Sequence, residues 1–165
     1  MREPSDAPYH LSTQWQFDAP LDAVWHAIAD ADTWQAWWKG VDSVPLDPGD
    51  ACGLGARRRY TCRSVLPLRL TFVACVTRVV PLQRIEGRVE GELEGVGCCR
   101  LRHANGVTTV RYDWRVRATR RWMTWLAPLA RPLLRWNHDQ LMRTGGIGLA
   151  RHLNAHNDAG MERPT

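Results

Sequence analysis

The feature that most constrains this chain is a change of hydrophobic period late in the sequence. Between about Val41 and Ala118 apolar and polar residues alternate, which is typical of strands with one buried and one wet face. From about Pro128 to Asn154 the apolar residues recur at spacings of three and four, as on one face of a long helix. That helix is the only long apolar element left to cover the dry face of the sheet, so we expect it to lie there.

The face of this helix has an unusual composition. His138, Met142, Gly145, Leu149 and Leu153 share it, so it combines a histidine, a thioether and a glycine. This mixture suits a helix that crosses a curved sheet with a space left between the two. The sequence therefore predicts a pocket, although it does not name what fills it.

Turn signals divide the alternating region into consecutive antiparallel strands. Residues 47–50, Asp-Pro-Gly-Asp, form a strong turn sequence, and Asn105-Gly106 is the strongest hairpin signal in the chain. The last strand follows that hairpin and turns Tyr112 and Trp114 inward. The earlier predicted strands are 41–46, 56–64, 68–80, 85–93 and 96–103.

The N-terminal part adds one strand and two helices. Alternation predicts a strand over 9–17, and helical spacing predicts helices over 21–30 and 32–38. Two consecutive helices directly after one strand exclude a repeating parallel βαβ layout. The expected fold class is therefore α+β, with the order β-α-α, six antiparallel strands and a long helix.

Length and composition indicate one ordinary domain. A chain of 165 residues is long enough to bury a core without metal or disulfides, and we expect one domain over 8–155 with flexible termini at 1–7 and 156–165. We find no apolar run of about 18 residues and no signal-type leader, so we expect a cytoplasmic protein.

The formal charge of +5 comes almost entirely from arginine. Glutamates at 86, 90, 92 and 94 lie near the arginines, so we expect ion pairs on a wet sheet face and no nucleic-acid partner. Five cysteines without zinc-type spacing predict free, mostly buried thiols. We expect no metal and no cofactor.

Three segments resemble the START-like superfamily, also called SRPBCC, and in particular its polyketide cyclase/dehydrase and lipid-transport branch. They are Phe17–Trp25, the aromatic group of Asp32-Thr33-Trp34 with Trp37-Trp38, and Met142–Leu153. The resemblance implies a helix-grip fold, as in START domains and birch-pollen allergens, with a hydrophobic cavity between sheet and C-terminal helix. Members bind lipids, sterols, quinones or polyketides, and a minority catalyse cyclisation, aromatisation or dehydration.

Within that implied cavity the sharpest candidate is His138, a possible acid or base near pH 7. The alternative is a histidine bonded to a strand carbonyl or turned out beside Asp139. Tyr112 is the second candidate catalytic group. The residues expected to line the ligand cavity are Tyr60, Val89, Tyr112, Trp114, His138, Leu141, Met142 and Gly145.

Three functions remain open from the sequence. The first is a binding or transfer module for a small hydrophobic or amphipathic ligand that is lipid-, polyketide- or quinone-like. The second is a cyclase or dehydratase that uses His138. The third is a co-chaperone or assembly partner that presents exposed tryptophans. Trp122 and Trp125 could make transient membrane contact, or could pack inward, and we expect a monomer or a homodimer.

Overall fold

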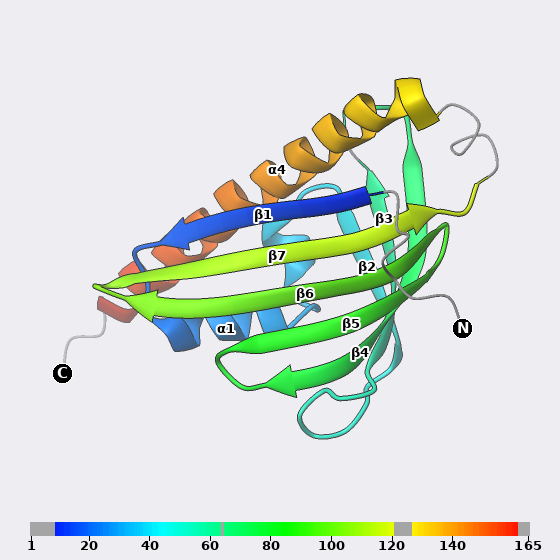
Figure 1. The fold of residues 1–165 in the computed structure, drawn as a ribbon. Helices are drawn as coiled ribbons and strands as arrows, with labels where there is room; N and C mark the ends of the chain where they lie inside the picture. The colour runs from blue at the N-terminus through cyan, green and yellow to red at the C-terminus, as the bar shows by residue number, and fades with distance from the viewer. Residues whose placement is uncertain (1–8, 64, 121–126, 162–165) are drawn as a thin grey trace.

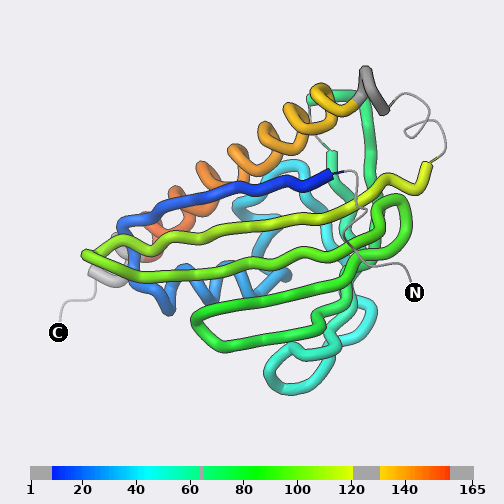
Figure 2. The backbone as a smooth tube through the Cα atoms, viewed as in Figure 1, coloured from blue at the N-terminus to red at the C-terminus, as the bar shows by residue number. Residues whose placement is uncertain are grey.

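The computed structural model describes residues 9–63, 65–120 and 127–161 (Figures 1 and 2). The N-terminal strand is followed by two helices, six further strands and a long helix. The elements are β1 (Tyr9–Phe17), α1 (Leu21–Ala29), α2 (Trp34–Trp37), β2 (Val41–Asp47), β3 (Arg57–Arg63), β4 (Arg69–Val80), β5 (Arg84–Gly91), β6 (Leu93–Ala104), β7 (Val107–Ala118) and α4 (Ala127–Met161).

All seven strands form one antiparallel sheet in the order β1-β7-β6-β5-β4-β3-β2. The sheet curves, and α4 crosses its concave side (Figure 1). This arrangement confirms the predicted α+β helix-grip fold. Asn105 and Gly106 have positive φ angles of 51° and 79°, as a tight two-residue hairpin requires.

The largest differences between the predicted boundaries and the structure occur at two places. The strand predicted over 85–93 ends at Gly91, and β6 begins at Leu93, because Gly91 takes a φ of 118° at the corner. Helix α4 continues past Asn154 to Met161, into the segment expected to be flexible. The predicted flexible segments 1–7 and 162–165 lie outside the described residues.

The convex face of the sheet carries the expected ion pairs. Arg117 on β7 contacts Glu94 on the neighbouring strand β6 at 2.6 Å, and Arg57 on β3 contacts Glu90 on β5, across β4, at 3.3 Å. Asp113 accepts from Ser12, Arg100 and Arg111 on the same face. Exposed pairs of this kind contribute about 0–1 kcal/mol each, so they shape the wet face more than they stabilise the fold.

The core lies between the sheet, the two short helices and the second half of α4. Its fully buried side chains come from α1, β7 and α4, namely Val24, Val110, Thr108 and Leu149. Three glycines of α4 meet the tryptophans of this core. A Cβ added at Gly145 would lie 2.5 Å from Trp38, one at Gly146 2.8 Å from Trp15, and one at Gly148 1.7 Å from the Trp37 carbonyl oxygen.

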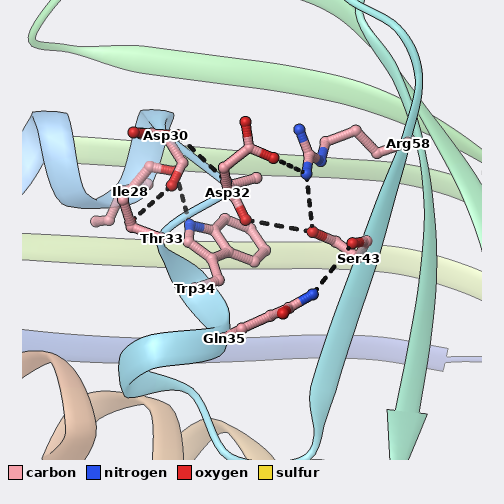
Figure 3. A network of polar contacts seen from close by, with 9 residues as sticks. Ile28, Asp30, Asp32, Thr33, Trp34, Gln35, Ser43 and Arg58 are labelled. Carbon is pink, nitrogen blue, oxygen red and sulfur yellow. Dashed lines mark hydrogen bonds and ion pairs between the residues drawn. The ribbon is translucent and has the colours of Figure 1, made fainter.

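A polar network ties the segment before α2 to strands β2 and β3 (Figure 3). Arg58 on β3 contacts Asp32 at 2.6 Å and donates to the Ser43 hydroxyl at 3.0 Å. The Ser43 hydroxyl donates to the Ala31 carbonyl, and the Trp34 indole donates to the Ile28 carbonyl at 3.1 Å. These bonds span the connection between α1 and α2, so they fix where α2 places its aromatic side chains.

Trp37 and Trp38 are buried in the core, with 4% and 6% of their surfaces exposed. All five cysteines are free thiols, but fewer are buried than expected, since Cys99 is buried, Cys62, Cys75 and Cys98 are partly buried and Cys52 is exposed. Trp122 and Trp125 lie outside the described residues. Among the helices that the structure describes, we find no segment with the length and hydropathy that a membrane crossing requires.

Candidate ligand cavity between the sheet and helix α4

A cavity of about 250 Å³ lies between the concave face of the sheet, α2 and the first half of α4. Its walls are mainly apolar because alternate residues of each strand turn inward. Gly87 and Gly97 are part of the wall, and a Cβ added at Gly97 would lie 2.9 Å from the Trp114 ring, so this glycine makes room for the ring. The described half of α4 that covers the cavity contributes Leu134, Asn137, His138, Leu141 and Met142.

Aromatic rings form a continuous part of the wall. Trp34 lies 5.5 Å from Tyr60, Tyr60 lies 5.7 Å from Phe72, and Phe72 lies 6.2 Å from Trp114, as measured between ring centroids. Rings at these separations and tilts attract each other and resist rearrangement. The cavity therefore has one preformed aromatic side, drawn from α2, β3, β4 and β7.

Tyr112 on β7 contributes a buried hydroxyl to the cavity wall. Its oxygen has no hydrogen-bond partner of ordinary geometry among the described residues, and the Cys99 thiol lies beside it on the paired strand. Burial raises the pKa of the Tyr112 hydroxyl well above its ordinary value, and the Cys99 thiol raises it further. Burial also raises the pKa of Cys99 to about 12, so both groups keep their protons at neutral pH.

His138 places an imidazole in the cavity wall from α4. Its Nε2 is buried and has no partner among the described residues, while Nδ1 lies 3.4 Å from the Asp139 carboxylate. Burial lowers the pKa of His138, and the neighbouring Asp139 opposes that shift only in part. The imidazole is therefore neutral at pH 7, and it can donate or accept a proton at its buried nitrogen.

Trp38 and Tyr60 add two further polar groups to the cavity wall. The Trp38 indole donates to the Leu141 carbonyl at 3.0 Å, which ties α2 to α4. Burial raises the pKa of the Tyr60 hydroxyl to about 12, although the nearby Arg58 guanidinium opposes the shift. Within the described residues no three His, Cys, Asp or Glu side chains converge as a metal site requires.

Seven of the eight residues expected in the lining are there, and Gly145 is not. Gly145 packs directly on the Trp38 indole, so the glycine marks close contact and not open space. His138 lies in the cavity wall, as a candidate acid or base should, and its Nδ1 lies beside Asp139, as the alternative interpretation expected. The sequence reasoning passed over Phe72 and Leu134, although the alternation of β4 and the helical spacing from His138 would have indicated them.

The sequence profile described as polyketide cyclase/dehydrase and lipid transport matches residues 9–152. The chain belongs to this family. A search among proteins with curated functions finds no match.

Solved structures share the fold at low sequence identity. A protein from Thermus thermophilus is 14% identical, with a TM-score of 0.71 over 87% of this chain and 99% of that one. A START superfamily protein from Mycobacterium smegmatis is 10% identical, with a TM-score of 0.70 over 88% and 97%. The Zhui aromatase/cyclase of Streptomyces sp. R1128 is 15% identical, with a TM-score of 0.69 over 88% and 93%.

Family membership and the cavity agree on the general function. The protein binds a small hydrophobic or amphipathic ligand between its sheet and its C-terminal helix. The cavity lies where the helix-grip fold encloses one, between the sheet and α4. The identity of the ligand depends on the polar groups in the wall.

Proposed function

We propose that this protein binds a flat, largely apolar molecule that carries one or two hydroxyl or carbonyl groups, as polyketides, quinones and some lipids do. One observation carries the proposal. Tyr112 and His138 each have a buried polar atom without a described partner, and both residues line the same cavity. Buried polar atoms in folded proteins are nearly always hydrogen-bonded, so a ligand oxygen that reaches either group by a shift of the surrounding side chains would supply the missing bond.

The size of the cavity supports a compact ligand. At about 250 Å³ it lies just below the range of about 300–1,000 Å³ that is usual for small-molecule pockets. The aromatic side formed by Trp34, Tyr60, Phe72 and Trp114 offers ring faces on which a flat molecule can stack. A ligand with fused rings matches both the volume and this wall.

The charge of the wall supports a ligand that is neutral where it is enclosed. Tyr112 and Cys99 keep their protons, and His138 is neutral at pH 7, as the directions of their pKa shifts require. The Glu86 carboxylate is paired with Arg84 at 3.0 Å. Burying an unpaired ligand charge among such groups would be costly, whereas a hydroxyl or carbonyl would not be.

Native mass spectrometry of the freshly purified protein, followed by organic extraction, tests the proposal directly. A retained aromatic, quinone or lipid molecule would support it and would identify the ligand. An apolar fluorescent probe then provides a binding assay for variants. A protein that is empty and also takes up none of a panel of such probes would contradict the proposal.

Two valine substitutions make that assay specific for the cavity. Val89 on β5 is 3% exposed and lines the cavity, whereas Val96 on β6 is 36% exposed. Val89→Phe should fill the space and weaken probe binding at least about tenfold, while Val96→Phe should leave binding unchanged. Equal binding by the two variants would place the probe elsewhere on the molecule.

A second candidate is an enzyme that uses His138 as acid or base with Tyr112 as a proton donor. The Zhui aromatase/cyclase shows that the fold is compatible with such chemistry, and the neutral imidazole is suited to it. His138→Ala separates the two candidates once a ligand is known. Turnover by the wild type that disappears in His138→Ala, while affinity for the ligand persists, would favour the enzyme. A ligand that the wild type binds but leaves chemically unchanged would favour a binding module.

A further inference from the structure

The first described turns of α4 carry a group of large exposed side chains, which we call the α4 rim. It consists of Arg131, Pro132, Leu133, Arg135 and Trp136. Leu133 is 48% exposed and Trp136 is 43% exposed. The two lie three positions apart, so they are neighbours on the helix surface. Isolated exposed apolar residues are common, but a leucine beside a tryptophan forms a patch.

The opposite side of the same turns forms the wall of the cavity. Leu134, Asn137 and His138 alternate along the helix with the α4 rim and line the cavity. These turns therefore present apolar side chains in two directions, inward to the ligand and outward to solvent. A helix that only covered a core would carry polar residues on its outer side.

The α4 rim also lies at one end of the cavity. The Arg131 guanidinium sits over the ring of Tyr9, 5.9 Å from its centroid, and Tyr9 is part of the cavity lining. The Leu66 amide contacts the Asn137 side chain at 3.4 Å, so the connection between β3 and β4 meets α4 at this end as well. Figure 2 shows these first turns of α4 at the same end of the molecule as the start of β1 and the end of β7.

The sequence around the α4 rim is basic, although Arg117 and Arg120, near the end of β7, pair with Glu94 and Glu92. Between Asp113 and Asp139 the sequence contains six arginines and no aspartate or glutamate. Within the described residues Arg131 and Arg135 are exposed and form no ion pair. Their charge is therefore available to an anionic surface, next to side chains that favour the boundary between water and hydrocarbon.

We propose that the α4 rim docks on a lipid bilayer that contains anionic lipids, and that it thereby brings the end of the cavity to the membrane surface. Trp136 and Leu133 would enter the headgroup region, and Arg131 and Arg135 would contact lipid phosphates. This inference goes beyond ligand binding, because the outer face of α4 takes no part in the cavity wall. It explains why large apolar side chains and unpaired cations lie together on the outer side of a helix.

Co-sedimentation of the full chain with vesicles tests the proposal. We expect binding to vesicles of phosphatidylcholine with phosphatidylglycerol, and weaker binding to phosphatidylcholine alone. The double variant Leu133→Ser, Trp136→Ser should lose binding at least about tenfold. Ile147→Ser is its matched control, since Ile147 is 47% exposed on the same helix but lies outside the α4 rim.

A second pair of variants tests the charge. Arg131→Gln with Arg135→Gln should weaken binding to the anionic vesicles about 30-fold, because each basic residue near such a surface contributes about 1 kcal/mol. Arg143→Gln with Arg151→Gln, also exposed on α4, should leave the affinity nearly unchanged. Raised salt should weaken wild-type binding, as screening requires.

Three results would overturn the proposal: no sedimentation of the wild-type chain, equal binding by the α4 rim and control variants, or a wild-type dimer that the rim substitutions dissociate. The last result would assign the surface to a second copy of the chain. Uptake of the apolar probe without vesicles should be the same in all these variants. Failure of docking is therefore distinguishable from failure of ligand binding.

Discussion

At the scale of single residues, two buried hydroxyls show what distinguishes the cavity from the core. Thr108 is fully buried, and its hydroxyl donates to the Ala19 carbonyl at 2.7 Å. Tyr112 is buried as well, but its hydroxyl has no described partner of ordinary geometry. Alternation along β7 predicted that Tyr112 faces inward. Whether the Tyr112 hydroxyl finds a hydrogen-bond partner depends on β6 and α4, and only folding brings these elements close to it.

Tyr112→Phe should therefore leave the stability of the empty protein unchanged or raise it by up to about 1 kcal/mol, since it removes an unpaired buried hydroxyl. Thr108→Val, which removes a bonded hydroxyl of similar burial, should cost about 1–2 kcal/mol. Urea unfolding followed by circular dichroism measures both. Equal losses in the two variants would mean that the Tyr112 hydroxyl has a stabilising partner after all.

At the scale of elements, the seating of α4 depends on its glycines. The helical spacing correctly placed Met142, Leu149 and Leu153 on the buried face. The interpretation of Gly145 as a sign of open space was wrong, because the space beside it is filled by Trp38. A glycine permits either a cavity or a close approach, and its neighbours along the chain do not tell which.

Gly148→Ala tests this close contact, since the added Cβ would lie 1.7 Å from the Trp37 carbonyl oxygen. Alanine favours a helix by up to about 1 kcal/mol over glycine, but here the displacement of α4 or α2 should outweigh that gain. We expect a net loss of about 2 kcal/mol in the free energy of unfolding. The control Arg151→Ala, at an exposed site of α4, should change it by less than about 0.5 kcal/mol. A variant Gly148→Ala as stable as the wild type would show that α4 can shift freely.

At the scale of the whole molecule, the curved sheet and α4 enclose one described interior cavity with a neutral histidine in its wall. A group that is harder to protonate in the folded protein than in the unfolded chain links stability to pH. Three expectations from the sequence stay predictions. They are the cytoplasmic location, the choice between monomer and homodimer, and the single domain over 8–155.

Stability should fall as the pH drops below about 6.5, the ordinary pKa of histidine. The reason is that the folded pKa of His138 is lowered, so the unfolded chain binds its proton first. The contribution is complete above pH 6.5 and is lost as the pH falls through the folded pKa. His138→Gln should flatten this part of the profile, with about 1.4 kcal/mol for each unit between the two pKa values. Identical profiles in the wild type and in His138→Gln would contradict the assignment.

The sequence by itself determined the order of elements, the α+β helix-grip architecture and the inward-facing strand residues, because period and turn chemistry are local properties of the chain. Val89, Tyr112 and Trp114 could thus be predicted as lining residues. Only the tertiary structure decided which inward side chains pack together and which border a space. Gly145 and Trp38 meet across more than a hundred residues of sequence, and the Tyr112 hydroxyl finds the Cys99 thiol beside it but no partner of ordinary hydrogen-bond geometry among the described residues. Such distances between remote residues follow from the assembled fold and are not written in the spacing of any one segment.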